Sequence, residues 1–378
     1  MSRRELRNPV EATKAIARLL GETSSVLAKR TSDRALGRGL YARPLDFDRD
    51  RAVLLFYEDF ERDRLLPNDR QVARALRRMY HAASKGQVAS GFEVAFRSLA
   101  LALDRAGYKV IVNDYALARR NPTYPIGIAG YPQILEHWKL PNPAVLGPGL
   151  LDHPSLAPDL MNDARFRSYI VPGEWMRAIF ARSYGERCAV WTAGIDTSAW
   201  PDMRAEPKDI DVLVYDKIVW KDPSYEASIV APLLRALDAR KKKYHRIRYR
   251  HYVHAEFLAL LARSRVMAFL SETETQGIAY QEAMACNVPI LAWDNGWWLD
   301  RQRFHGDTVR LPASSIPHFD DRCGISFRDA SGIETAVDAM FGRATAFEPR
   351  QFVEDRLSLA VSAARYVELY TAASKARS

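Results

Sequence analysis

The sequence predicts an α/β fold made of two Rossmann-like domains, and three observations support this. Short apolar runs that read as strands alternate with amphipathic helical segments along most of the chain. The length of 378 residues suits two cores of about 150–200 residues better than one. The alternation also restarts after a polar, proline-containing stretch, residues 196–209. Such alternation is typical of parallel sheets covered by helices on both faces.

The first domain is predicted over residues 51–200. Its strand candidates are short and apolar, and two of its helix candidates end at glycine, which suits the left-handed position after a helix. Strands are predicted at 53–58, 108–114, 125–130, 143–149 and 167–173, and helices at 68–83, 92–107 and 174–185.

The second domain is predicted over residues 201–350. Strands are expected at 211–216, 265–271 and 289–293, and helices at 225–240 and 255–264. A long amphipathic helix, 350–373, follows, and residues 351–378 are expected to pack back on the first domain. Residues 1–50 read as an added helical segment.

Composition limits the classes of protein to which this chain can belong. A net charge of +9 favours an anionic partner such as phosphate, nucleic acid or an acidic membrane surface. No apolar run approaches the length that spans a bilayer, and the N-terminus lacks a secretory core. The three cysteines, Cys188, Cys286 and Cys323, form no CxxC pair, which argues against a structural zinc site. We therefore expect a cytoplasmic protein.

A basic run at residues 239–252, ARKKKYHRIRYRHY, has two interpretations. Aromatic residues between arginines resemble a nucleic-acid platform. The favoured interpretation is a lysine-rich helix end followed by a half-exposed strand. We expect no nucleic-acid partner, and peripheral contact with the inner face of the membrane remains an option.

The most informative stretch is SETETQGIAYQEAMACNVPILAW, residues 271–293. A strand ends at Ser271, so the following loop lies at the carboxyl edge of the sheet, where open parallel sheets bind ligands. The next helix begins near Gly277, and its N-terminus suits a phosphate. Glu274 and Glu282 can face one pocket from two sides and accept hydrogen bonds from sugar or ribose hydroxyls. Glu272 is interpreted only as an acid near the helix N-terminus.

This stretch resembles the donor motif of the retaining nucleotide-sugar glycosyltransferases of family 4, which have the GT-B fold. Segments 90–114 and 167–200 resemble the first glycine loop and the link between the domains in that family. The chain departs from the usual Gly-Phe at Thr275 and Gln276, where the donor sugar would contact the loop, and has Asn287 for a glycine. The matching residues are Glu274, Gly277, Glu282, Ala283, Met284, Ala285, Cys286 and Pro289.

The resemblance implies a transferase of glycan biosynthesis that binds a nucleotide-diphosphate sugar without a metal or other cofactor. Glu282 would accept from the ribose hydroxyls, and Glu274 would lie by the donor sugar. Lys217 and Lys221 would stabilise the diphosphate, although the family usually has an arginine and a lysine about five apart. The remaining expected donor-site residues are Gly91, near the diphosphate, and Thr275, Gln276, Gly277 and Ile278.

A histidine beside the reacting sugar has two candidates, His153 and His137. His153 follows a predicted strand and is equally well interpreted as a loop or helix-cap residue, whereas His137 reads as a helix-surface residue. Trp297 and Trp298 are expected to pack between the domains rather than stack on a ligand.

Three other functions compete with metal-independent glycosyl transfer by a GT-B enzyme. A nucleotide-sugar epimerase of GT-B-like fold would share the ribose carboxylate and need no acceptor. A metal-dependent transferase would need an Asp-x-Asp at a strand's carboxyl end, but Asp209 and Asp211 precede their strand. A basic nucleic-acid-binding protein without catalysis would show a steep salt dependence. The sequence does not name the acceptor, which is a glycan, a lipid or a small molecule.

Overall fold

The computed structural model describes Asp48 and residues 50–58, 91–136, 138–218, 223–298 and 311–375. The predicted helical segment 1–50, except Asp48 and Asp50, and the predicted helix 68–83 lie outside the described residues. So do Lys221 and His137. In the described part of the chain, no helix combines the length and the apolar character needed to cross a membrane.

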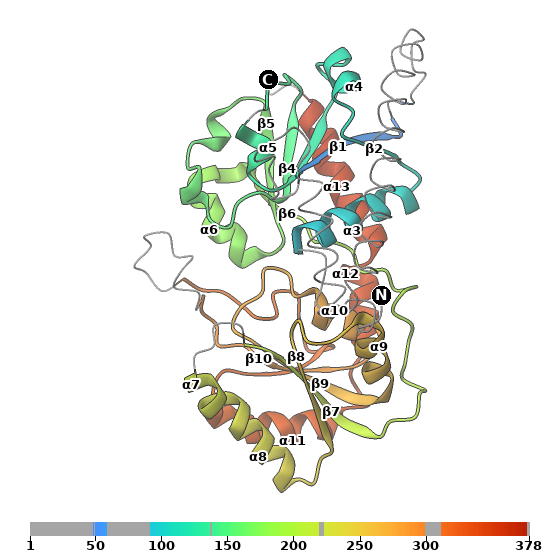
Figure 1. Ribbon diagram of the computed structural model, residues 1–378, viewed down its shortest axis with the longest axis vertical. Helices are drawn as coiled ribbons and strands as arrows, with labels where there is room; N and C mark the ends of the chain where they lie inside the picture. The colour runs from blue at the N-terminus through green and yellow to red at the C-terminus, as the bar shows by residue number, and fades with distance from the viewer. Residues whose placement is uncertain are drawn as a thin grey trace, which may run out of the picture. The chain divides into compact units, whose positions relative to one another are not determined.

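The first domain is built on a six-stranded sheet with the order β2-β1-β3-β4-β5-β6. Neighbouring strands from β1 through β6 pair in parallel. Strands β1, β3, β4 and β5 are largely buried, and helices cover the sheet (Figure 1), whereas the edge strand β2 is partly exposed. They are β1 Ala52–Glu58, β2 Lys109–Val112, β3 Ile126–Gly130, β4 Ala144–Gly149, β5 Phe166–Val171 and β6 Cys188–Val190.

The second domain is built on a five-stranded parallel sheet with the order β11-β10-β9-β7-β8. The first strand, β7, lies between β8 and β9, so the direction of winding reverses beside it. Such a switch point is where doubly wound sheets bind ligands. The strands are β7 Ile210–Lys217, β8 Tyr244–Arg248, β9 Ser264–Ser271, β10 Ile290–Trp293 and β11 Gly324–Phe327.

Alternating side chains of β7 divide between two cores. Val212 and Val214 lie in a core with α8 and α11, whereas Leu213 and Tyr215 lie in a core with α9, α10 and α12. This period of two is what a strand covered on both faces requires. The helices that cover this sheet are α7 Pro223–Tyr225, α8 Ala231–Ala239, α9 His254–Arg263, α10 Ile278–Ala285, α11 Ile333–Arg343 and α12 Pro349–Arg356.

The last helix, α13, returns to the first domain. It packs against α3 and also contacts β4 and β5 (Figure 1). The Tyr370 hydroxyl donates to the carbonyl of Pro125 and accepts from the amide of Leu54. These helices and the others of the first domain are α3 Gly91–Arg105, α4 Tyr115–Arg120, α5 Gln133–Glu136, α6 Glu174–Tyr184 and α13 Leu359–Ser374.

The predicted fold class, α/β with two Rossmann-like domains, is confirmed. Two predicted helices differ in detail. The helix expected at 225–240 contains a π-helical turn, Glu226–Val230, before α8. The helix expected at 350–373 is two helices, because Ser358 adopts extended backbone and its side chain accepts from the amide of Val361. A serine with this geometry caps a new helix.

Candidate functional site

Lys217 and Glu274 meet at the carboxyl edge of the second sheet, beside the switch point. Lys217 is the last residue of β7, and its Nζ lies 2.7 Å from Glu274 Oε1 and 2.8 Å from Oε2. Ser271, the last residue of β9, donates its hydroxyl to Glu274 Oε1 at 2.8 Å. The Tyr249 ring also faces the ammonium, 4.7 Å from Nζ to the ring centroid. Glu274 is buried, so this pairing offsets the cost of removing its charge from water.

Glu282 lies in the second turn of α10, eight residues after Glu274, where the sequence placed it. Its side chain is partly buried and forms no hydrogen bond or ion pair with any other residue that the structure describes. Burial raises the pKa of this carboxyl to about 8, because the charged form loses hydration. Glu282 is thus an acceptor group with no protein partner in the described chain.

Gly277 is required by local packing. It has φ of 82° and precedes the first residue of α10. A Cβ on this residue would lie 2.1 Å from the ring of Tyr280, so no other residue fits without displacing that ring. Asn287 ends the same unit with φ of 64°, the left-handed cap predicted from the sequence.

The donor-motif loop, residues 272–277, connects β9 to α10, and the residues predicted to bind the donor differ in their exposure. Thr275 is exposed and Ile278 is partly buried. Gln276 is buried, and its amide faces the first domain instead of open space: Oε1 accepts from the Ala193 amide at 2.9 Å, and Nε2 donates to the Ala193 carbonyl at 2.7 Å.

Glu272 differs from its predicted role. It follows β9 directly and is 2% exposed, whereas α10 begins at Ile278. It therefore lies outside the first turn of that helix. Its carbonyl accepts a hydrogen bond from the Asn295 side chain at 2.7 Å.

His153 caps a short 3-10 helix, Pro154–Leu156, which is one of the two roles weighed for it. Its Nδ1 accepts from the Ser155 amide at 3.2 Å. The buried ring also lies 6.0 Å, centroid to centroid, from Trp298. Gly91, expected in a loop, is instead the first residue of α3, with open space around the position of a Cβ.

Two tryptophans connect His153 with the donor-motif loop. Trp298 packs edge-on against Trp175, with 5.7 Å between ring centroids. Trp175, in the first turn of α6, donates its Nε1 to the Glu274 carbonyl at 3.0 Å. Trp298 is buried, as expected for a packing role. Sequence reasoning missed Trp175 and Tyr249, although each follows the carboxyl end of a strand closely.

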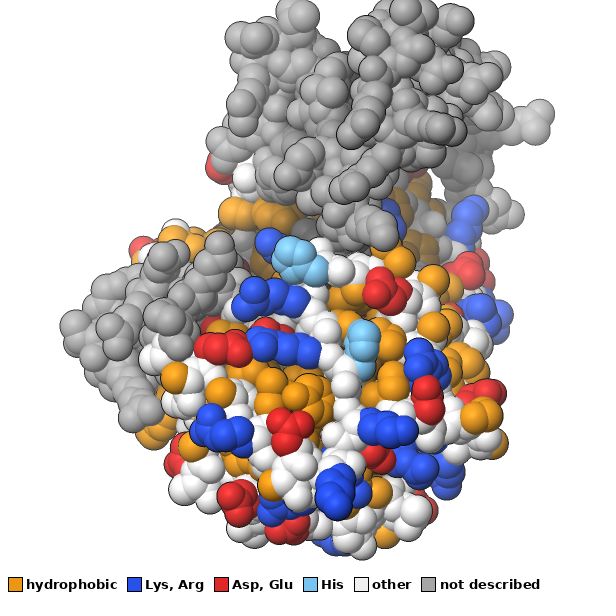
Figure 2. All heavy atoms as spheres, turned by 60° about the horizontal axis from the view of Figure 1, so that its bottom comes forward, with side chains coloured by type: hydrophobic (Ala, Val, Ile, Leu, Met, Phe, Trp, Pro, Cys, Tyr) orange, Lys and Arg blue, Asp and Glu red, His pale blue; other side chains and the backbone are white. Residues whose placement is uncertain are grey.

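Part of the basic run 239–252 is paired with acidic side chains from elsewhere in the second domain. Arg240 forms a bidentate contact with Asp338, and Arg246 pairs with Asp216 and Glu226. β8, which carries part of the run, is one of the two edge strands of its sheet, where charged side chains oppose edge-to-edge pairing. Figure 2 shows cationic and anionic side chains interspersed on the face that carries the second domain. These contacts favour the structural interpretation of the run.

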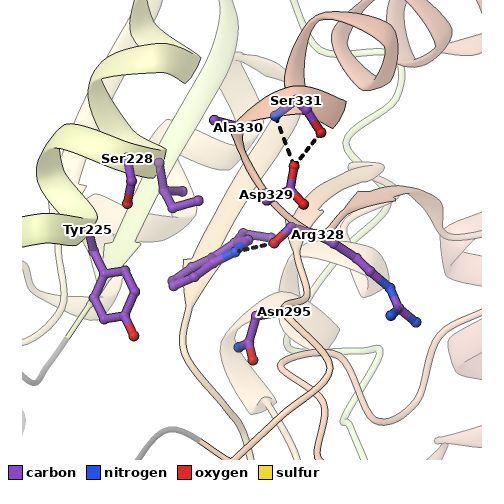
Figure 3. A pocket seen from close by; sticks show the side chains of 9 residues that line it. Tyr225, Ser228, Asn295, Arg328, Asp329, Ala330 and Ser331 are labelled. Carbon is purple, nitrogen blue, oxygen red and sulfur yellow. Dashed lines mark hydrogen bonds between the residues drawn. The ribbon is translucent and has the colours of Figure 1, made fainter.

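A separate pocket of about 390 Å³ lies where β10 and β11 end. In Figure 3, Tyr225 and Ser228 face it from one side and Asn295 and Ala330 from the other, while the Arg328 guanidinium extends away from Tyr225. Lys217, Glu274 and Glu282 do not line it. Its described lining residues are Tyr225, Ser228, Ile229, Trp293, Asn295, Arg328, Asp329, Ala330 and Ser331.

The Asp-x-Asp sequence lies at the amino end of β7, as predicted. Asp209 pairs with Arg263, and Asp211 accepts from the Lys243 amide at 2.9 Å. Within the described ranges, no group of three or more His, Cys, Asp or Glu side chains is arranged to hold a metal ion.

One family model matches part of the second domain. Residues 202–309, which include Lys217, Glu274 and Glu282, match the family model described as glycosyl transferases group 1. No curated protein matches the chain.

Solved structures show distant similarity. AviGT4, a glycosyltransferase involved in avilamycin A biosynthesis, is 13% identical with a TM-score of 0.45, over 76% of this chain and 91% of that one. Sucrose-phosphate synthase from Thermosynechococcus elongatus is 12% identical with a TM-score of 0.48, over 85% and 99%. The pneumococcal O-GlcNAc transferase GtfA, solved with UDP and GlcNAc, is 12% identical with a TM-score of 0.44, over 68% and 59%. Similarity at this level does not transfer substrates to this chain.

Proposed function

We propose that this protein is a glycosyltransferase that moves a sugar from a nucleoside diphosphate sugar to an acceptor hydroxyl with retention of anomeric configuration and without a metal. Residues 202–309, which match the family model described as glycosyl transferases group 1, support this proposal. The acceptor belongs to a glycan, a lipid or a small molecule. One observation carries the proposal. The paired Lys217 and Glu274 lie at the switch point of the second sheet, and Glu282, without a described partner, follows eight residues later.

The donor would occupy the edge formed by the ends of β7 and β9. Ribose hydroxyls would donate to Glu282, the exposed Thr275 would contact the sugar, and the N-terminus of α10 with Lys217 would face the diphosphate. Lysine acts there as a point charge, because its ammonium lacks the bidentate geometry of arginine.

The chemistry requires stabilising a leaving diphosphate and a cation-like sugar. Glu274 is a poor nucleophile in this arrangement, because Lys217 contacts both of its oxygens and Ser271 donates to one of them. We therefore assign the proton of the acceptor hydroxyl to a diphosphate oxygen. The bond from the anomeric carbon to phosphate breaks as the bond to the acceptor oxygen forms on the same face, which retains configuration.

Two measurements test this proposal. Thermal unfolding with UDP, GDP and ADP, each with and without EDTA, should show stabilisation by one nucleotide that EDTA leaves unchanged, since ligands that bind only the folded state raise its stability. Product NMR from an α-linked donor should then show an α-linked product. A β-linked product contradicts retention, loss of binding in EDTA contradicts metal independence, and an epimer released without acceptor replaces transfer with epimerisation.

A further inference from the structure

The side chain of Gln276, in the donor-motif loop, forms two hydrogen bonds with the backbone of the first domain. Its amide both accepts from and donates to Ala193, at 2.9 and 2.7 Å, as a neighbouring strand would. Ala193 follows β6 and is 1% exposed. Its amide and carbonyl have no other hydrogen-bond partner among the described residues. Gln276 therefore satisfies two buried backbone groups that would otherwise be left unpaired.

The same amide reaches α10. Gln276 Nε2 also donates to Gln281 Oε1 at 3.0 Å, and Gln281 Nε2 donates back to the Gln276 carbonyl at 2.8 Å. Both side chains are buried. Gln276 follows Glu274 by two residues and Gln281 precedes Glu282, so this network lies between the two carboxylates of the proposed donor site.

A second contact holds the loop from the same domain. Trp175 on α6 donates to the Glu274 carbonyl at 3.0 Å. The backbone of the loop is thus tied at Glu274 and at Gln276 to segments of the first domain. The family pattern has phenylalanine at the position of Gln276, and a phenyl ring can make neither hydrogen bond with Ala193.

We propose that Gln276 is a positioning residue: by pairing with Ala193 and Gln281 it makes the first domain set the geometry of Glu274 and Glu282, so that donor affinity depends on the contact between the domains. The inference rests on the proposed function for its effect on donor binding, whereas the contact itself can be tested without a ligand.

The ligand-free test is hydrogen–deuterium exchange of the full chain. The Ala193 amide should exchange slowly in the unaltered protein. Gln276→Met, which keeps the length of the side chain and removes its hydrogen bonds, should raise exchange at Ala193 and in residues 274–277 by roughly tenfold, the effect of losing about one net hydrogen bond. Gln351→Met is the matched control, because Gln351 is exposed on α12 and bonds only to Asp355 among described residues.

The second test is nucleotide affinity, measured by calorimetry with whichever of UDP, GDP and ADP binds. Gln276→Met should weaken affinity roughly tenfold and raise donor KM more than it lowers kcat, while Gln351→Met leaves both unchanged. Gln281→Met should keep the protection of Ala193 and still weaken affinity, which a general loss of folding would not do.

The outcomes separate this inference from the proposed function. If Gln276→Met leaves both exchange at Ala193 and affinity unchanged, the inference is wrong. If affinity falls while Ala193 stays protected, Gln276 contacts the donor directly and the positioning role is also wrong. If exchange at Ala193 rises in Gln276→Met but no nucleotide binds even the unaltered protein, the contact between Gln276 and Ala193 exists. In that case both the proposed donor site and the positioning role are wrong.

Discussion

Lys217 and Glu274 are 57 residues apart in the chain, and their side chains form an ion pair with 2.7 Å between Nζ and Oε1. Lys217 is the last residue of β7, and Glu274 lies in the loop that follows the adjacent strand β9. The register of the sheet brings them together, because Lys217 pairs with Ser271, three residues before Glu274. The ammonium of Lys217 suits a diphosphate, and the carboxylate of Glu274 suits sugar hydroxyls. The ion pair therefore places both kinds of binding group side by side.

Replacing Lys217 should slow the reaction more than it weakens substrate binding. Negative charge grows on the leaving diphosphate in the transition state, so Lys217→Gln should lower kcat by roughly 100-fold with a smaller change in donor KM. Steady-state kinetics measures both, and circular dichroism verifies folding. Lys139→Gln, at an exposed position, is the control. A rise in KM with unchanged kcat would show that Lys217 contributes only ground-state binding.

Glu282 should make nucleotide affinity depend on pH. Burial raises the pKa of Glu282 to about 8, and ribose hydroxyls donate best to the ionised form. Affinity for the nucleotide should therefore rise between pH 6.5 and 9, and Glu282→Gln should bind more weakly with a flat profile in that range. Calorimetry at three pH values measures this. Equal affinity of the variant and the unaltered protein at pH 9 would show that Glu282 does not contact the nucleotide.

The same pKa should affect folding stability. Below the unfolded-state value, 4.5, the carboxyl is neutral in both states and carries no penalty. As pH rises toward 8, the unfolded chain releases this proton while the folded chain keeps it, so the free energy of unfolding falls. Urea unfolding at pH 5 and 8.5 should show a smaller fall for Glu282→Gln than for the unaltered protein. Glu256→Gln, exposed on α9, should behave like the unaltered protein, and identical falls in all three would contradict the assignment.

Trp298 should contribute to stability through its contacts with Trp175 and His153. Its side chain is buried, and truncating a buried tryptophan to alanine costs about 3 kcal/mol or more. Urea unfolding should show a loss of this order for Trp298→Ala. Leu156→Ala is the control, because Leu156 is 53% exposed. A loss below about 0.5 kcal/mol, the range of surface changes, would mean that these rings do not stabilise the fold.

Exposed cations of the basic run should recruit anionic membranes if the acceptor lies there. Lys241 and Lys243 are exposed, and neither side chain forms an ion pair with a described carboxylate. The protein should sediment with anionic vesicles and not with neutral ones, and Lys241→Glu with Lys243→Glu should reduce this binding, since each basic residue contributes about 1 kcal/mol near such a surface. Equal sedimentation with both vesicle types would contradict the membrane contact.

Local patterns predicted most of the strands, the positions of Glu274 and Glu282, and the left-handed Asn287, because each depends on neighbours within a few residues. The short strand β11 was not predicted. The contact of Gln276 with Ala193 spans 83 residues and that of Trp175 with Glu274 spans 99, and no periodicity links such pairs. The break at Ser358 was missed because apolar spacing continues across it. A serine among apolar residues was the available signal, since its hydroxyl competes for backbone amides.

Helix α13 has a consequence for biosynthesis. Tyr366 and Tyr370 are buried, Tyr370 bonds to both Leu54 and Pro125, and the Tyr366 hydroxyl fills the space a side chain on Gly127 would need. The first domain therefore cannot complete its core until residues near the end of the described chain have left the ribosome. The two cores of the second domain are complete by Leu357, before Tyr366 and Tyr370, so the domain encoded later is the first that can finish folding.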